Sequence, residues 1–241
     1  KSVEICGPLI YIEFHSRSAF SFLEGASLPE ELVGVCQHFQ MPAMALLDSD
    51  GVYGAPRFHL AAKKIGIKAH IGAEVTTTLN SPRSHGDFRL PLLVANRTGY
   101  QNLCRLITKM KLRAKKGEGA VSAQELEAHA EGLICLTGGD EGPLAAALAH
   151  ARPEEAQSQL DCLIGIFGPK NVYVELQRHF HREEESRNRL AIDLARSFNL
   201  PLLATNGVNY AIPKARELCD AFTAIRHHKT LSTAGRLLAR N

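Results

Sequence analysis

The sequence predicts an α/β protein folded as a distorted, seven-stranded β/α barrel of the TIM-like kind. Seven apolar runs of strand length recur along the chain, and amphipathic segments of helical length separate most of them. The chain has 241 residues, of which 45% are hydrophobic, enough for a sizeable buried core. Seven such units in succession favour a closed or nearly closed barrel over an open doubly wound sheet.

The expected strands alternate with helices, an arrangement typical of a parallel sheet joined by helical crossovers. They are residues 11–14, 43–48, 68–75, 90–95, 132–137, 172–177 and 201–205. In such barrels, functional side chains gather at the carboxyl ends of the strands and in the loops that follow them. The strand ends are therefore the places to search for a site.

Start signals mark several of the helices between these strands. Ser27 and Thr98 each stand just before an amphipathic stretch, and we expect both to act as N-caps. Ser122 and Glu125 have the spacing of a capping box, in which each side chain bonds the other residue's backbone N–H.

Composition excludes several classes of protein. The longest apolar runs are far too short to cross a bilayer, and the start lacks the apolar region of a signal peptide, so we expect a cytoplasmic protein without membrane contact. The six cysteines lie far apart, which indicates reduced thiols rather than a disulfide or zinc framework. A net charge of +3 permits contact with nucleic acid but does not argue for it.

Polar side chains recur where the expected strands end. They are His15, Arg17 and Glu24 after the first strand, Asp48, Ser49 and Asp50 after the second, Glu74 in the third, Arg89 near the fourth, His179 after the sixth, and residues 205–210 after the seventh. Residues two apart share a face of an extended segment, so His15 and Arg17 point the same way. We expect these groups to meet at one mouth of the barrel.

A family resemblance is carried by the stretches FHSRSAFSFLEGAS, LPEELV, ALLDSDGVYGAPRF, AAKKIGIKAHIGAEV, LLVANRTGYQNLCRLI, GLICLTGGDEGPLA, VELQRH and LPLLATNGVNY. Together they resemble the PHP (polymerase and histidinol phosphatase) domain of bacterial DNA polymerase III alpha subunits, most closely the error-prone, translesion branch. The resemblance covers nearly the whole chain. It implies a PHP barrel over residues 1–212 and a helical connection over residues 213–241 toward a polymerase body, with a role in DNA replication or DNA repair synthesis.

Metal-binding members of this family hold two or three ions at the barrel mouth, and the resemblance allows their ligand positions to be compared with this chain. Suitable groups remain at His15, Glu24, Asp48, Glu74 and His179, where Asp48 matches the acid beside a ligand rather than the ligand itself. Ligand positions are substituted at Arg17, Ser49, Arg89, Gly207 and Asn209. The resemblance therefore implies a remnant of a metal site.

The chemistry of the substituted residues argues against a strongly bound metal. Zinc and manganese need imidazole, carboxylate or thiolate ligands, whereas Ser, Asn and Gly supply weak ligands or none. A guanidinium stays protonated, and at about 4 Å it would repel a divalent ion by roughly 8 kcal/mol at an effective dielectric near 20. We expect no catalytic residue and no cofactor, with Arg17 and Arg89 pairing Glu24, Asp48 or Glu74 in place of a cation. Zinc or manganese at partial occupancy is the alternative.

Three functions remain open on the sequence alone. The first is a catalytically silent structural and docking domain whose partner is the polymerase body of the same parent chain, with DNA contacted through that parent. The second is a metal-dependent phosphoesterase or 3′ to 5′ proofreading exonuclease with one ion held by His15, Glu74 and His179. The third is direct nucleic-acid contact through a basic stretch, for which a solvated helix end is the competing interpretation. That stretch contains Lys109, Lys111, Arg113, Lys115 and Lys116.

Overall fold

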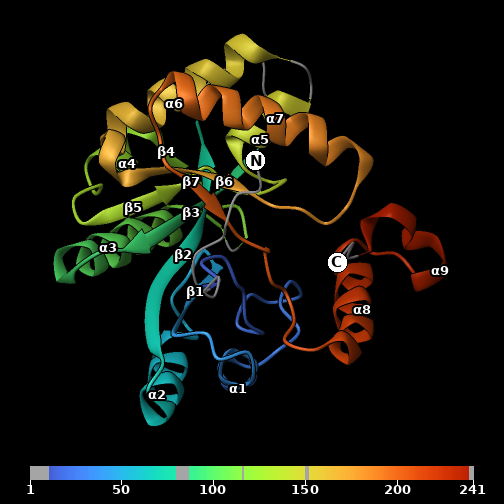
Figure 1. Cartoon of the computed structure of the whole chain (residues 1–241). Coiled ribbons are helices and arrows are strands. Elements are labelled where there is room, and N and C mark those ends of the chain that lie inside the picture. Colours follow the sequence, from blue (N-terminus) through green and yellow to red (C-terminus); the bar gives the residue numbers. More distant parts are fainter. Residues whose placement is uncertain (1–10, 80–86, 116, 150–151, 239–241) are drawn as a thin grey trace, which may run out of the picture.

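The centre of the fold is a curled β-sheet, seen in a computed structural model that describes residues 11–79, 87–115, 117–149 and 152–238 (Figure 1). Along the sheet the strands are β1 (Ala43–Ser49), β2 (Lys68–Thr78), β3 (Phe88–Val94), β5 (Leu133–Leu136), β6 (Val172–Leu176) and β7 (Leu202–Ala204). A short strand, β4 (Val121–Ser122), pairs with the far end of β2.

The sheet is mixed, which corrects the expectation of a parallel sheet throughout. β1 and β2 are parallel, as are β5, β6 and β7, but β3 runs antiparallel to both of its neighbours. The connection between Thr78 and Phe88 is shorter than the dozen or so residues that a parallel crossover needs, so the chain has to reverse direction there.

The first expected strand, residues 11–14, forms no ladder in the described part of the chain. Instead, two isolated bridges join Glu13 to Met44 and Ser16 to Val208. The backbone bonds agree, because Ala45 N–H donates to the Glu13 carbonyl at 2.8 Å and Val208 N–H donates to the His15 carbonyl at 2.9 Å. This extended segment thus lies between β1 and the chain that follows β7. A complete barrel of seven regular ladders is not formed by the described residues.

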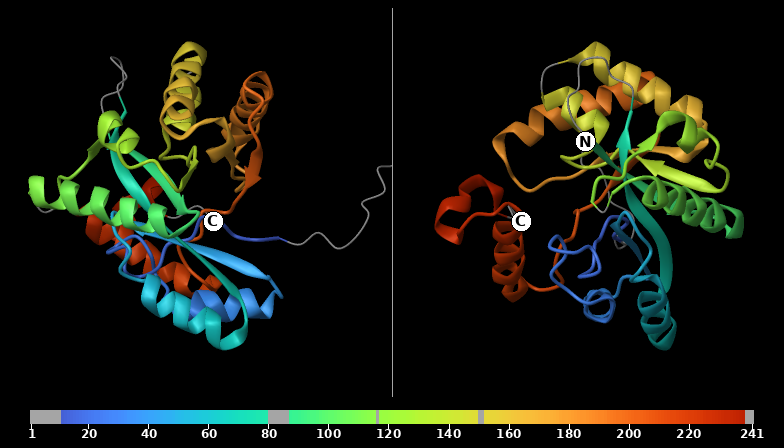
Figure 2. Two further views of the ribbon diagram at one scale, coloured as in Figure 1. Left: turned by 90° about the vertical axis from the view of Figure 1, so that its left-hand side faces the viewer. Right: turned by 180° about the vertical axis from the view of Figure 1, so that it is seen from behind.

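Helices cover the outside of the sheet (Figures 1 and 2). They are α1 (Pro29–His38), α2 (Ala55–Ile65), α3 (Arg97–Arg113), α4 (Ala123–Glu127), α5 (Pro143–Ala149), α6 (Pro153–Phe167) and α7 (Arg182–Ser197). At one side of the molecule, α8 (Arg216–Arg226) and α9 (Leu231–Ala234) stand apart from them. Among the described helices, none has both the length and the apolar character needed to span a membrane.

One of the three predicted start signals is confirmed. The Ser122 hydroxyl accepts a hydrogen bond from Glu125 N–H, and the Glu125 carboxylate accepts one from Ser122 N–H, which makes a capping box. Thr98 is not an N-cap, because α3 begins one residue earlier and the Asn96 side chain accepts from Gly99 N–H at 3.0 Å.

Ser27 is not an N-cap either, so this prediction was also wrong. Helix α1 begins at Pro29, whose fixed φ suits the first turn, and Leu28 occupies the cap position. The Ser27 hydroxyl instead accepts a hydrogen bond from Ala211 N–H at 2.9 Å. The hydroxyl oxygen that would cap the helix is therefore hydrogen-bonded to the segment that follows β7.

Apolar side chains pack on both sides of the sheet. On β1, Met44 and Leu46 pack toward α1 and α2, whereas Ala45 and Leu47 belong to a cluster inside the curl. The largest cluster lies between the sheet and helices α3 to α7 and includes Leu90, Leu106 and Leu160. Because the side chains of a strand alternate between faces, one run of apolar residues serves both layers. The five described cysteines are free thiols, as predicted.

Candidate functional site

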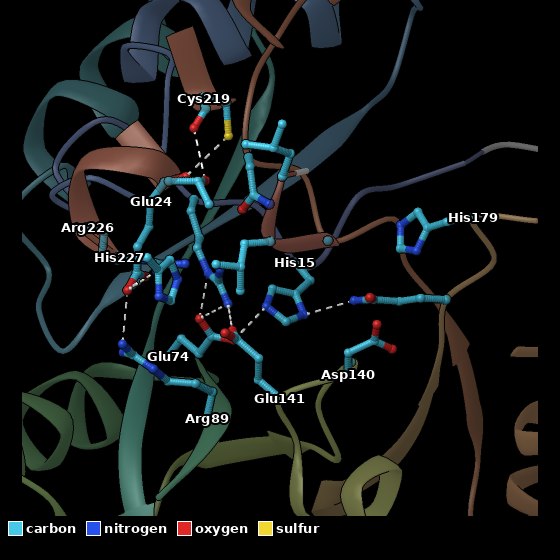
Figure 3. A pocket seen from close by; sticks show the side chains of 18 residues that line it. His15, Glu24, Glu74, Arg89, Asp140, Glu141, His179, Cys219, Arg226 and His227 are labelled. Carbon is cyan, nitrogen blue, oxygen red and sulfur yellow. Dashed lines mark hydrogen bonds and ion pairs between the residues drawn. The ribbon is translucent and has the colours of Figure 1, made fainter. Parts of the chain in front are cut away.

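A cavity of about 680 Å³ opens at one mouth of the curled sheet (Figure 3). Most of the predicted positions line it, namely His15, Arg17, Glu24, Glu74, Arg89, His179, Gly207 and Asn209. Residues that the sequence reasoning did not single out line it as well, including Asp140, Glu141, Gln177, Cys219, Arg226 and His227. Asp48 and Ser49 are not among its described lining residues.

Strand register brings the charged groups together. Ser49 at the carboxyl end of β1 pairs with Glu74 on β2, and two residues further along β2 Thr76 pairs with Arg89. His15 and Arg17 follow from the extended segment beside β1 and share one face, as predicted. The charge at the mouth therefore comes from the carboxyl-terminal parts of the parallel strands, where β/α folds usually place their sites, and also from the amino end of the antiparallel strand β3, which carries Arg89.

His15 lies buried between two carboxylates. Its Nδ1 is 2.6 Å from Glu175 Oε1, and its Nε2 is 3.1 Å from Glu74 Oε1. Burial lowers the pKa of His15, but the charges of Glu175 and Glu74 outweigh burial and raise it to about 10. The ring is thus an imidazolium near neutral pH, with both nitrogens donating to carboxylate oxygens.

Arg17 pairs with the other oxygen of Glu74. Both Nε and Nη2 of Arg17 lie 2.6 Å from Glu74 Oε2, and Nη2 also reaches Glu141 Oε2 at 2.7 Å. Burial raises the pKa of Glu74, but Arg17 and His15 outweigh burial and hold it at about 2. The buried carboxylate is therefore ionised and compensated by two cations of the chain itself.

A second cluster forms around Glu24. Its Oε1 accepts from Arg89 Nη2 at 3.0 Å and lies 2.8 Å from Arg226 Nη1 on helix α8, while its Oε2 accepts from the Ser49 hydroxyl. Burial raises the pKa of Glu24, but Arg17 and Arg89 outweigh it and hold the pKa below its usual range. Figure 3 shows Glu24, Arg89 and Arg226 pointing toward one another.

Asp48 takes no part in either cluster. Its Oδ1 accepts from Ser18 N–H and the Ser18 hydroxyl, both at 2.8 Å, and from the Ser21 hydroxyl at 2.9 Å. Its Oδ2 accepts from Gly54 N–H at 3.2 Å. Arg17 therefore pairs with Glu74, and Arg89 pairs with Glu24. Asp48, the third carboxylate expected to pair with an arginine, instead accepts hydrogen bonds from nearby loop residues.

His179 lies at the rim with both ring nitrogens engaged. Nδ1 is 3.1 Å from Glu184 Oε1, and Nε2 is 2.9 Å from the carbonyl oxygen of Asn206. Glu184 also accepts the backbone N–H of His179 at 2.7 Å, so the position of this histidine is set by the first turn of α7.

Two buried residues complete the site, Glu175 on β6 and Gln177 in the loop after it, and neither was predicted from the sequence. Glu175 accepts hydrogen bonds from His15, from Gln177 Nε2 at 2.9 Å and from the Thr205 hydroxyl. Its Oε2 is buried without a hydrogen-bond partner among the described residues. The available signal was an acidic residue within an apolar strand, because buried charges in strands are seldom found without partners.

Gln177 occupies space that two glycines leave open. A Cβ atom added at Gly139 would lie 2.4 Å from Gln177 Oε1, and one added at Gly207 would lie 2.8 Å from Gln177 Nε2. Gly207 also has a φ of +60°, a conformation that residues with side chains seldom adopt. An acidic residue at position 207 would therefore require Gln177 to move.

The basic stretch lies away from this cavity, at the end of α3. Lys109, Lys111 and Arg113 are exposed in the last turns of that helix, and Arg113 pairs with Glu125. Lys115 follows the helix, and Lys116 lies outside the described residues. Basic side chains at a helix carboxyl end interact favourably with its dipole.

Within the described ranges, no group of three histidine, cysteine, aspartate or glutamate side chains is placed to hold a metal ion.

Solved structures of other proteins share the fold of this chain. A structure of a protein from Bifidobacterium adolescentis, proposed to be a metal-dependent phosphoesterase, superimposes with a TM-score of 0.60 at 15% identity, over 86% of this chain and 90% of that one. An amidohydrolase from Chromobacterium violaceum, with bound sulfate and no metal, gives a TM-score of 0.52 at 14% identity over 83% and 87%. These similarities show a shared α/β fold.

Residues 13–179 match the PHP domain, and the chain belongs to this family. It is 36% identical to an error-prone DNA polymerase of Mycobacterium tuberculosis over 95% of the chain and 21% of that protein. It is 35% identical to an error-prone DNA polymerase of an Anaeromyxobacter species and 32% identical to a DNA polymerase III subunit alpha of Treponema pallidum, in each case over 20% of the relative. The chain thus spans about a fifth of the length of these curated relatives.

Proposed function

We propose that this chain is a structural and docking PHP domain of an error-prone DNA polymerase III alpha subunit, acting in DNA replication or repair synthesis, with a mouth that no longer holds catalytic metal ions. Its partner is the polymerase body of the same parent chain, and DNA is contacted through that parent. The similarity to much longer polymerase chains supports the partner, and the geometry of the mouth supports the lost chemistry.

The observation that carries this proposal is the pair between Arg17 and Glu74. Glu74 stands at a position where metal-binding relatives of the family place a ligand, yet Arg17 contacts one of its oxygens at 2.6 Å and His15 contacts the other at 3.1 Å. A divalent ion at this carboxylate would have to displace a guanidinium or lie close to it, and the two like charges would repel each other strongly.

The remaining donors do not fit a metal cluster either. His15 donates from both ring nitrogens to carboxylates, and both ring nitrogens of His179 lie against oxygens of Glu184 and Asn206, so neither ring presents an unoccupied nitrogen to a metal ion. Gln177 fills the space beside Gly207 that an acidic ligand would need. The carboxylates at the mouth are neutralised by histidine and arginine side chains of the chain itself, and these contacts support no hydrolytic step.

The alternative, a phosphoesterase or proofreading exonuclease using one ion on His15, Glu74 and His179, is not favoured by these contacts. All three side chains are engaged by other groups of the protein, and Arg17 and Glu141 form an ion pair beside Glu74. Zinc or manganese at partial occupancy would require several of these hydrogen bonds to break.

We also propose that residues 1–212 form the PHP unit and that residues 213–241 form the connection toward the polymerase body. The separate position of α8 and α9 supports this division (Figure 2). We further infer that residues 11–16 act as the strand that completes the barrel, which the two isolated bridges on either side of this segment support.

Elemental analysis and a nuclease assay test the proposed function. The chain would be purified with added zinc and manganese, its metal content measured, and release of nucleotides from labelled single-stranded DNA followed. We expect well under one ion per chain and no release above that of a His179→Gln control. One or more ions per chain, together with release that the His179→Gln change abolishes, would contradict the proposal.

A further inference from the structure

We propose that the carboxy-terminal segment 213–238 is a strap that docks over the cavity through Glu24, and that the cavity opens and closes with helix α8. The inference extends the proposed docking role to a particular contact. Its test needs neither metal nor DNA, so it can fail while the proposed function stands.

The strap contacts Glu24 at two points. Arg226 Nη1 lies 2.8 Å from Glu24 Oε1, and the Cys219 thiol is 3.8 Å from the Glu24 carbonyl oxygen, to which it donates. Thr223 and His227 of the same region line the cavity, and so do Leu237 and Leu238 further along the strap. One wall of the charged cavity therefore belongs to a segment that follows the sheet and its covering helices.

The attachment of the strap differs from that of the other helices. Among the described residues, none from Ile212 to Leu238 belongs to the three clusters of buried apolar side chains that hold α1 to α7 on the sheet. Leu218 and Ile225 of α8 are instead exposed to solvent. Helix α8 does bury Cys219, Thr223 and Ala224, but these side chains are small, so it separates from its support at lower cost than a helix packed into a core through large apolar side chains.

Glu24 remains compensated when the strap leaves. Arg89 Nη2 contacts the same Oε1 at 3.0 Å, and the Ser49 hydroxyl donates to Oε2. Releasing Arg226 therefore does not leave an unpaired buried carboxylate, which would otherwise make opening prohibitive. Glu24 has two sets of partners, one from the sheet and one from the strap, so both the docked and the undocked arrangement are open to it.

Chemical labelling of Cys219 measures the undocking. This thiol is 3% exposed while the strap is docked, so alkylation by N-ethylmaleimide reports the open fraction, and mass spectrometry resolves each cysteine. We expect Arg226→Ala to raise the labelling rate of Cys219 about tenfold, the size expected for loss of one hydrogen bond between charged groups. Raising the salt concentration should speed labelling in the parent chain and have little effect in the variant.

Two controls separate undocking from unfolding. Cys135 on β5 is fully buried in the core, and its labelling should stay unchanged if only the strap moves. Arg196→Ala on α7 removes an equivalent charge from an exposed ion pair and should leave Cys219 as slow as in the parent chain. The proposal would be overturned by equal Cys219 rates in the parent chain and Arg226→Ala, or by acceleration of Cys135 in step with Cys219.

Discussion

The two mouths of the curled sheet are built from the same strands and have opposite chemistry. At one mouth, His15, Arg17, Glu24, Glu74 and Arg89 surround a charged cavity. Toward the other end of the strands, a cavity of about 730 Å³ is lined largely by apolar and aromatic side chains. They include Phe14, Ile71, Leu93, Ile134, Leu136, Tyr173 and Leu203. On β6, Tyr173 and Glu175 are only two residues apart, yet they belong to different environments.

The difference shows that the two ends are stabilised by different interactions, apolar burial at one end and ion pairing at the other. The apolar end gains free energy from each buried side chain separately, and this gain depends little on pH. The charged end has to offset the desolvation of its ions, so every ion there depends on a partner. We expect substitutions at the charged end to be severe when they remove one partner, and to act through pH as well.

Removing one carboxylate of the charged mouth gives the largest expected effect. Glu74→Gln leaves the buried charges of Arg17 and His15 without their shared partner, so we expect the free energy of unfolding to fall by about 3–5 kcal/mol. Urea denaturation monitored by circular dichroism measures this loss. Glu118→Gln, in an exposed turn, is the matched control, and a loss below about 1 kcal/mol at Glu74 would break the comparison.

At the apolar mouth, we expect truncation of one side chain to lower the free energy of unfolding by somewhat less, and by an amount that does not depend on pH. Leu136→Ala removes a fully buried side chain from the cluster inside the curl, and we expect a loss of about 3 kcal/mol. The same denaturation experiment at pH 6 and at pH 9 should give an equal loss for this variant. A loss that changes strongly with pH would show that the two mouths are coupled.

The charged mouth also predicts how stability depends on pH. His15 has a pKa of about 10 in the folded chain against 6.5 ordinarily, so its stabilisation is complete below pH 6.5 and is lost as the pH rises through 10. Burial raises the pKa of Glu13 to about 7, so its stabilisation is lost between pH 4.5 and 7. Glu74, with a pKa of about 2, contributes above pH 4.5 and loses its contribution as the pH falls toward 2.

Stability should therefore be greatest near about pH 5 and decline toward alkaline pH. Urea midpoints measured at pH 5, 7 and 9 test this, and His15→Gln should reduce the decline between pH 7 and 9. An unchanged midpoint across this range in the parent chain would argue against a protonated His15.

The smallest effect is expected far from both mouths, at the end of α3. Replacing Lys109, Lys111 and Lys115 with glutamine should leave the thermal midpoint nearly unchanged, because these side chains are exposed. We also expect no change in binding to single-stranded DNA at two salt concentrations. A shallower salt dependence in the variant would instead assign this stretch to nucleic-acid contact.

Much of the site could be predicted because it lies at strand ends that the apolar pattern marks. His15, Arg17, Glu74 and Arg89 were placed at one mouth by strand periodicity, and they do meet there. Glu175 and Gln177 were missed because a single polar residue in an apolar run does not reveal its partner. Arg226 was missed because it comes from a helix about 200 residues away in the chain from Glu24, and no local pattern records that distance.

The sequence by itself determined the α/β class, the positions of most strands and the PHP resemblance, because each depends on residue type and short-range spacing. Only the tertiary structure decided the reversed direction of β3, the replacement of Ser27 as a cap, and the choice of Glu74 and Glu24 over Asp48 as the partners of the arginines. These outcomes depend on which groups meet in space, where a long-range hydrogen bond or ion pair outweighs a local preference of about 1 kcal/mol.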